Sequence, residues 1–370
     1  YTTACENPQR FGGSDVMNRI SYDAGPHAGE MHRAIINAMN TEIALMCDAL
    51  SIDWRLIYEM VVVGNTTMRE LFFNHDVQPI GQKPYKAAIE IDLRAGRRDT
   101  TSRLELARHL KLRANKNARV YGVPLVASHV GGDVAADLIA VGLPAQSGTM
   151  MLVDAGTNTE VVLRHGDRVL AASCPAGPAF EGGLVQFGMP GCAGAIESVR
   201  SSNGGFEYQT ICNATPQGIC GSGLIALLAE LRRSERMTPL GVFADRKEKV
   251  DVVPEQRITL SRADASHLAQ AKAANYCGQM ILMRTAGISP ADIECLYLAG
   301  GFANYVDPAA AIEIGFIPPV PPERIRKVGN AASQGARQLL LSGCKRTEIE
   351  RFIQQIEHVE LETTPDFFEM

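Results

Sequence analysis

The feature that most constrains the fold is a run of three β-rich segments between residues 149 and 177. The segments MMLVDAG, TEVVLRHGD and RVLAASCPAG are each about as long as an average strand, and two polar turns, Gly-Thr-Asn and His-Gly-Asp, separate them. Turns this short join antiparallel neighbours. The pattern therefore predicts a meander of three strands.

Apolar residues at helical spacing lie on both sides of this meander. Residues 27–52 and 261–283 show that spacing, and so does the late stretch VGNAASQGARQLLLS. The segment GICGSGLIALLAELRR predicts a further helix, with Gly221 or Ser222 as its cap. Because strands and helices alternate, the chain is predicted to be of the α/β class.

The first third of the chain gives a weaker pattern. The β-branched run EMVVV is followed by a Gly-Asn turn and then by a helix that begins at Thr66 or Thr67, whose hydroxyls we expect to act as helix caps. Residues 86–118 are rich in charge around RAGRRDTTSR. We interpret this stretch as a solvated connection between halves of the chain.

Composition narrows the class of protein. The 370 residues carry 36 Lys and Arg against 41 Asp and Glu, a net charge of −5, so we expect no nucleic-acid partner. No apolar run approaches 18 residues, so we expect no membrane span. The nine cysteines lie at irregular spacings without a CxxC pair, which indicates neither a zinc ribbon nor a ferredoxin motif and fits a reducing, cytoplasmic compartment.

The first candidate site is the turn in VDAGTNTEVVL. Asp154 ends a predicted buried strand, and a carboxylate in that position can hold a hydrated Mg²⁺ ion. The glycine in the turn lets successive backbone N–H groups face one concavity, which suits phosphate oxygens. The simpler alternative is a polar hairpin turn without a ligand.

Two further segments carry glycines next to predicted elements. The strand ECLYLAGG stops on Gly300 and Gly301, and the missing side chains let a flat ligand such as a nucleoside approach the backbone. In SHVGGDVAADLIA, Asp133 follows two glycines at the start of a helix. The alternatives are an ordinary strand-to-helix turn and an ordinary helix cap.

Taken together, these motifs resemble those of a known superfamily. A DxGT hairpin at the head of a three-stranded meander, a glycine-bounded helix before it and a glycine-ended strand after it are similar to the phosphate loop, connecting helix and adenosine motif of the actin-like ATPases. More closely, the chain resembles the nucleotide-binding part of the ATP-dependent reductive activators of corrinoid proteins from about residue 6 to about residue 341. Eight blocks in fixed order carry this resemblance: ENPQRFGGSDVMNRISY, VVVGNTTM, PLVASHVGGDVAAD, LVDAGTNTEVVL, PAGPAFEGG, GICGSGLIALLAEL, LAGGFANYVDPAAAIEIGFIP and VGNAASQGA.

The resemblance implies a fold and a set of roles. The fold would be actin-like (ribonuclease H-like) α/β, with two lobes at 1–142 and 143–370, each a mixed sheet flanked by helices. The first lobe would contain the charged insertion at 86–118. The resemblance implies ATP and Mg²⁺ as ligands, with these residues in contact or in catalysis: Asp154 for Mg²⁺; Gly156, Thr157 and Asn158 for phosphates; Gly300, Gly301 and Phe302 for adenosine; Asp133 as a water-orienting carboxylate; and Gly221 and Ser222 at a helix start that presents N–H groups to an anion.

The resemblance also implies a reaction. Corrinoid carriers are sometimes oxidised from Co(I) to Co(II), and activators of this family use ATP to drive the one-electron reduction back, with electrons from an amino-terminal [2Fe–2S] domain. This chain contains neither the cysteine spacing of that cluster nor the DxGTT hairpin that precedes the NPQ block in the family. We therefore expect it to be part of a longer protein, with an unpaired sheet edge in its first lobe. The implied partner is a corrinoid methyl-carrier protein or a corrinoid-dependent methyltransferase, and a homodimer is a further expectation.

Three alternatives remain at this point. Cys174 and Cys192 from two chains would supply four thiolates, as in the dehydratase activators that hold a [4Fe–4S] cluster between subunits. Buried structural thiols are the simpler interpretation of these cysteines, and we favour it. A small-molecule kinase of the same superfamily is the second. The third is a docking module without catalysis. Glu181 in PAGPAFEGG is a candidate for the neighbouring cleft, and by default a loop glutamate is only a solvated charge.

Overall fold

The computed structural model describes residues 1–13, 15–202, 204–244, 247–361 and 364. The chain forms two compact units, of which the first contains Tyr1–Gln146 and Ala331–His358 and the second contains Ser147–Asn330 and Val359–Met370. The expected lobes at 1–142 and 143–370 differ from this division, because the segment 331–358 packs in the first unit.

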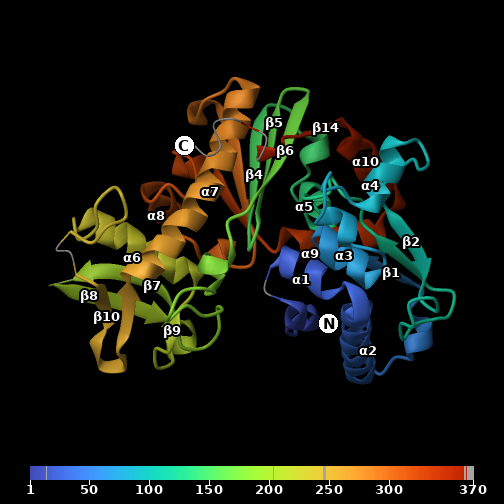
Figure 1. Ribbon diagram of the computed structural model, residues 1–370, viewed down its shortest axis with the longest axis horizontal. Helices are drawn as coiled ribbons and strands as arrows, with labels where there is room; N and C mark the ends of the chain where they lie inside the picture. The colour runs from blue at the N-terminus through green and yellow to red at the C-terminus, as the bar shows by residue number, and fades with distance from the viewer. Residues whose placement is uncertain (14, 203, 245–246, 362–363, 365–370) are drawn as a thin grey trace. The chain divides into compact units, whose positions relative to one another are not determined.

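The predicted meander is confirmed and forms the main sheet of the second unit. Strands β4 (Thr149–Ala155), β5 (Thr159–His165) and β6 (Arg168–Cys174) pair antiparallel in register, as Figure 1 shows in green. On the other side of β4, β12 (Cys295–Ala299) and β13 (Ile325–Gly329) add in parallel, so the order within this unit is β13-β12-β4-β5-β6. A mixed sheet of this kind is the predicted α/β architecture.

Helices and two smaller sheets complete the second unit. The longest helix described in this unit, α7 (Arg262–Ala286), packs on β5 and β6. It begins with a capping box, in which the side chains of Ser261 and Asp264 each accept a hydrogen bond from the other residue's backbone N–H. The remaining elements are α6 (Gly221–Arg233), α7 (Arg262–Ala286), α8 (Pro308–Glu313), β7 (Ala195–Ser202), β8 (Gly205–Thr210), β9 (Gly218–Ile219), β10 (Lys249–Val253) and β11 (Ile258–Ser261). Strands β8, β7 and β9 form one sheet, and β10 and β11 form a hairpin.

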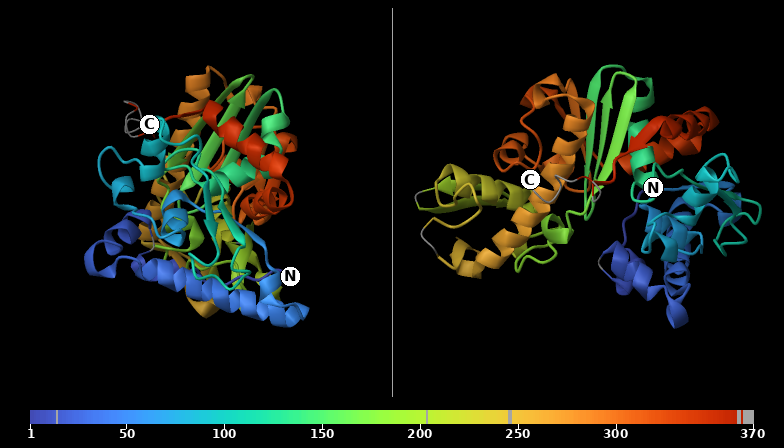
Figure 2. Two further views of the ribbon diagram at one scale, coloured as in Figure 1. Left: turned by 90° about the vertical axis from the view of Figure 1, so that its right-hand side faces the viewer. Right: turned by 45° about the horizontal axis from the view of Figure 1, so that its top comes forward.

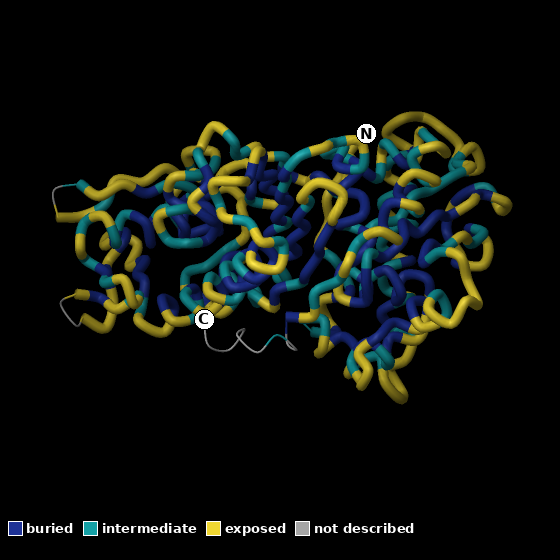
Figure 3. Tube along the Cα trace, turned by 90° about the horizontal axis from the view of Figure 1, so that it is seen from above, coloured by how far each residue is buried: buried dark blue, intermediate teal, exposed yellow. Residues whose placement is uncertain are grey.

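The core of the second unit explains its continuous apolar runs. All five residues of β12 and the first five of β5 are buried, so the sheet is covered on both faces there. Figure 3 colours the trace by burial, with buried residues in dark blue and exposed residues in yellow. Strands buried on both faces need apolar side chains on both, which is why the sequence shows runs and not alternation.

The first unit is built on a three-stranded sheet. Its order is β1-β3-β2, with β1 (Glu59–Val62) parallel and β2 (Arg103–Leu106) antiparallel to the central β3 (Arg119–Gly122). Strand β1 lies at the edge of this sheet, and all four of its residues are half-buried. The helices of the unit are α1 (Val16–Tyr22), α2 (Glu30–Leu50), α3 (Thr66–Phe72), α4 (Ala88–Arg94), α5 (Gly132–Ala140), α9 (Ala331–Leu341) and α10 (Gly343–Phe352). Among the described residues, none of the helices in either unit is long and apolar enough to cross a membrane.

The interpretation of residues 86–118 as a solvated connection is wrong. This stretch contains α4 and β2, and it contributes a series of buried side chains to the core of the first unit: Ala87, Ile89, Ala107, Leu110, Leu112, Ala114 and Ala118. The charged residues lie between these apolar positions. Most of these charges lie on exposed faces of folded elements, whereas Lys86 and Glu90 are buried.

The segment that returns to the first unit packs closely. Helix α9 lies against α5, and a Cβ at Gly335 would collide with the carbonyl of Ala136. Only glycine permits this approach. Figure 2 shows α9 and α10 in red beside the turquoise α5. Strand β14 (Ile356–His358) ends the segment, and in the second unit the Val359 N–H then donates to the Ala171 carbonyl at 2.8 Å.

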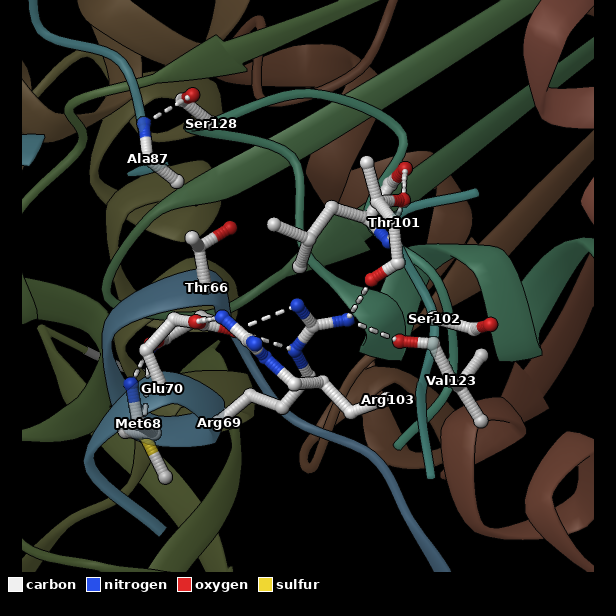
Figure 4. Close-up of polar contacts among 12 residues, drawn as sticks. Thr66, Met68, Arg69, Glu70, Ala87, Thr101, Ser102, Arg103, Val123 and Ser128 are labelled. Atoms are coloured by element: carbon white, nitrogen blue, oxygen red, sulfur yellow. Dashed lines mark hydrogen bonds and ion pairs between the residues drawn. The ribbon is translucent and has the colours of Figure 1, made fainter. Parts of the chain in front are cut away.

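A charged cluster is buried in the first unit. Figure 4 shows the Arg69 guanidinium between the Glu70 carboxylate and the carbonyls of Thr101 and Val123, to which Nη1 donates at 3.0 and 2.6 Å. Glu70 also accepts from Arg103, and the side chains of Arg69 and Glu70 are 0% and 3% exposed. Burial alone raises the pKa of Glu70, but the attraction of Arg69 and Arg103 outweighs it and holds that pKa below its ordinary value.

Candidate functional site

The turn between β4 and β5 is the centre of the candidate site. Asp154 is half-buried at the second-last position of β4, in register with Glu160 of β5 and Ala299 of β12. Gly156, Thr157 and Asn158 form the turn itself, and all three are partly accessible. The predicted Mg²⁺ and phosphate residues are therefore contiguous at one end of the sheet.

Glu181 lies against this turn. The Thr157 hydroxyl donates to Glu181 Oε2, and a Cβ on Gly156 would lie 3.5 Å from Glu181 Oε1. Glu181 ends a short 3-10 helix, Pro178–Glu181, that follows β6. The two residues are 24 positions apart in the sequence, so local spacing does not predict this contact.

The loop that follows β12 lies against the end of β4. Gly300 has φ +115°, and a Cβ there would collide with the Ala155 carbonyl oxygen. Its N–H donates to the Gly329 carbonyl at 3.0 Å. At Gly301 nothing lies within 4 Å of a built Cβ, so the backbone is open to a ligand at that point.

The start of α6 contacts the Gly300–Phe302 loop. A Cβ on Gly221 would lie 3.2 Å from Phe302 Cγ and would collide with the Phe180 carbonyl. Cys220 is the N-cap residue and makes no side-chain cap bond, so the expectation that Gly221 or Ser222 caps the helix is wrong; both lie in its first turn. The Ser222 hydroxyl instead lies 3.4 Å from Cys220 Sγ.

Three phenylalanines connect these loops. The ring of Phe316 lies 5.1 Å from that of Phe180, edge to face, and 6.4 Å from that of Phe302. The Phe316 carbonyl accepts from the fully buried amides of Asn275 at 2.7 Å and Gln279 at 3.0 Å. Helix α7 thus fixes the residue on which both the Phe180 and the Phe302 loops pack.

We expect Gly300→Ala to destabilise the second unit by roughly 2–4 kcal/mol, because the new methyl group meets the Ala155 carbonyl and the backbone is in the glycine region. Gly301→Ala is the matched control, since its Cβ enters open space, and it should change the unfolding free energy by less than about 0.5 kcal/mol. Urea unfolding of both variants measures the difference. Equal stability of the two variants would contradict the close approach.

The predicted residue Asp133 lies in the first unit, in the first turn of α5. The N-cap of this helix is Gly131, so the alternative in which Asp133 is the cap does not hold. A Cβ on Gly131 would lie 2.6 Å from the Asn65 Cα, and the Gly132 N–H donates to the Gly64 carbonyl at 3.1 Å. The GNTT turn and the GGD turn are therefore packed together, with Asp133 beside them.

The threonines of the GNTT turn are not caps. Asn65 caps α3 by accepting from the Met68 N–H at 2.9 Å, and both Thr66 and Thr67 are buried in the first turn. Thr66 Oγ1 donates to the Ala127 carbonyl at 3.4 Å. The expectation that their hydroxyls cap the helix is wrong, because asparagine at the preceding position fills that role.

Cys174 is fully buried under α7, where a Cβ on Gly278 would collide with its Sγ atom. Burial raises the pKa of this thiol, which disfavours the thiolate that a cluster needs. Cys192 is exposed. In the described part of the chain no three His, Cys, Asp or Glu side chains converge on a metal position. The interpretation of Cys174 as a packed structural thiol therefore fits better than a subunit-bridging cluster.

The fold and the site define the class of protein. A ribonuclease H-like meander with a DxGT turn, joined in parallel by a glycine-ended strand, is the ASKHA architecture, and residues 148–370 match the family described as the C-terminal domain of RACo, the ASKHA domain. Residues 1–146 match the RACo middle region. The chain therefore belongs to the RACo family.

Individual relatives agree with that assignment. The chain is 32% identical to the corrinoid activation enzyme RamQ of Eubacterium limosum over 391 residues, which cover 98% of the chain and 64% of RamQ. It is 23% identical to the Co(II) methylated amine-specific corrinoid protein reductase of Methanosarcina barkeri, over 96% of the chain and 68% of the reductase. The solved structure of a reductive activator for corrinoid, iron-sulfur protein superposes with a TM-score of 0.85 and 31% identity, over 98% of the chain and 60% of that structure. The chain therefore spans less than two thirds of the length of RamQ and of this solved activator.

Proposed function

We propose that the chain binds ATP with Mg²⁺ in its second unit and uses it to drive the reduction of a corrinoid protein from Co(II) to Co(I), with electrons from an iron–sulfur domain outside this chain. The observation that carries the proposal is the convergence of three segments: the Gly156–Asn158 turn, the Gly300–Phe302 loop and the start of α6. The names of the relatives, an activation enzyme, a corrinoid protein reductase and a reductive activator, support the corrinoid substrate.

The residues present fit a nucleotide. The turn offers the Thr157 hydroxyl and a glycine without a side chain, which suit phosphate oxygens. The first turn of α6 carries N–H groups without a side-chain cap, and the open backbone at Gly301 lies next to the Phe302 ring, where a flat base can stack. Asp154 alone suits Mg²⁺ held through water, because that ion usually keeps several waters and one or two carboxylates.

The bound nucleotide would supply the free energy for an uphill electron transfer. The residues of the chain would translate it into a change of conformation, since a ligand that binds one conformation more tightly shifts the population towards it. Asp154 would hold Mg²⁺ through water, Thr157 and Asn158 would contact phosphate groups, and Phe302 would line the adenosine side. In the first unit, Asp133 would orient the attacking water from the start of α5.

The partner in this proposal is a corrinoid methyl-carrier protein or a corrinoid-dependent methyltransferase, and the chain would act as a homodimer. The compartment is the cytoplasm, where the nine free cysteines stay reduced. A small-molecule kinase would need an acceptor site with its own base. The corrinoid relatives favour reductive activation over that alternative and over a docking module without catalysis.

We expect ATP binding and corrinoid-protein binding to be coupled. Isothermal titration of the chain with a non-hydrolysable ATP analogue, with a Co(II) corrinoid protein, and with both together measures this coupling. A coupled system changes the affinity of each ligand by the same factor, about 5- to 150-fold in typical cases. Additive heats and unchanged dissociation constants would argue against an ATP-driven activator.

A further inference from the structure

The carboxylate of Glu181 lies on the turn where the proposed function needs phosphate. Oε2 accepts the Thr157 hydroxyl, and Oε1 faces Gly156, the position at which a side chain would obstruct a phosphate group. Glu181 is exposed, so neither burial nor an ion pair in the described residues demands that it lie there.

The backbone that carries Glu181 is fixed on both sides. Before it, Phe180 is buried and packs edge to face on Phe316, and its carbonyl touches the first turn of α6 at Gly221. After it, Gly182 has φ +88°, and a Cβ there would lie 2.5 Å from the Met189 nitrogen. The main chain therefore holds Glu181 within reach of Thr157, and only its side chain is free to turn away.

A carboxylate and a phosphate cannot use this turn together. The Thr157 hydroxyl has one proton to donate, so it serves either Glu181 or a phosphate oxygen. Two anions at the same turn also repel each other, and the repulsion is stronger than in bulk water next to a protein surface. Glutamine at this position would keep the hydrogen bond and remove the repulsion.

We propose that Glu181 is an intramolecular competitor of the nucleotide phosphates: its carboxylate occupies the Thr157 hydroxyl beside Gly156 and must swing out when ATP binds. The proposal rests on the proposed ATP site and adds a residue that sets its affinity. Glu181 thus lowers the affinity for the nucleotide, because its side chain must leave the turn before phosphate can bind there.

The test measures dissociation constants of ATP and of inorganic tripolyphosphate for the wild-type chain, Glu181→Gln and the matched control Glu255→Gln, which removes an equally exposed charge elsewhere in the second unit. We expect Glu181→Gln to bind both anions about two- to fivefold more tightly, with no change in Glu255→Gln. Because the effect is electrostatic, it should shrink at high salt. In the background of Thr157→Val, the carboxylate of Glu181 loses the hydroxyl that holds it at the turn. The gain from Glu181→Gln should therefore shrink in that background, which a double-mutant cycle detects.

Two outcomes overturn the role of Glu181 as a competitor. Equal or weaker binding by Glu181→Gln at low salt means that the carboxylate does not compete. Weaker binding only when Mg²⁺ is present would make Glu181 a ligand of the metal. Tripolyphosphate separates this inference from the ATP proposal: tighter tripolyphosphate binding by Glu181→Gln without ATP binding by any variant would retain the competitor and refute the nucleotide site, whereas no binding of either anion would refute both.

Discussion

Asp154→Ala should lower ATP hydrolysis at least about 100-fold in the complete activator while the second unit stays folded. Asp154 is half-buried at the end of β4, directly before the turn that would hold the phosphates, so its carboxylate is placed to orient a hydrated Mg²⁺ ion. A phosphate-release assay measures hydrolysis, and circular dichroism measures folding. The thermal midpoint should fall by no more than about 2–4 °C, because one partly accessible side chain is removed.

The matched control for this variant is Asp251→Ala. Asp251 is an exposed carboxylate on β10 in the same unit, and its removal changes the net charge equally. Hydrolysis by the control should equal that of the wild type. If Asp154→Ala turned over at the wild-type rate, Asp154 would not be the metal residue, whatever the control showed.

Glu70→Leu should destabilise the first unit by about 3–5 kcal/mol, the cost of leaving buried charges without a counter-ion. Glu70 is the carboxylate between Arg69 and Arg103, and Arg69 is fully buried. The protein contains one tryptophan, Trp54, which lies in the first unit and makes its fluorescence a local probe of urea unfolding. Glu105→Leu is the control, because its pair with His109 is exposed and worth less than about 1 kcal/mol.

The contribution of Glu70 should depend on pH in a definite direction. Its pKa in the folded chain lies below its ordinary value of 4.5, so the folded unit favours the carboxylate. The stabilisation is fully present above pH 4.5 and is lost as the pH falls through the lowered folded-state pKa. The stability gap between wild type and Glu70→Gln should therefore close on acidification, and a constant gap from pH 7 to pH 3 would contradict the buried pairing.

Local patterns predicted the parts of the fold that depend on local interactions. The meander β4–β6 follows from strand-length β-rich runs with polar turns between them, and α7 follows from apolar spacing after a Ser261 cap. The stretch 86–118 was misjudged for a related reason. In it, small buried residues such as Ala107 and Ala114 alternate with cations, and charge count alone does not separate a half-buried element from a solvated loop.

Long-range contacts could not be predicted from the sequence. Arginine is almost never fully buried, so nothing in TTMRELF indicates that Arg69 is buried and donates to the carbonyls of Thr101 and Val123. Glu181 meets Thr157, and Gly221 meets Phe302, only through the tertiary fold. The motifs at Asp154 and Gly300 were found from sequence because each combines a strand end with glycine, but their mutual contact was not.

The close packing of α9 on α5 has a consequence for the order in which the protein folds during synthesis. The chain starts with the first unit, yet Gly335 must reach Ala136 before that unit has its full set of helices. Domains usually fold as units while the ribosome is still adding residues, at about 5–20 residues per second. Here residues 147–330, which belong to the second unit, leave the ribosome before α9, the helix that packs on α5. The first unit therefore stays partly assembled until the second unit has been synthesised. In the cell, a chaperone would meet the apolar face of α5 uncovered during that interval.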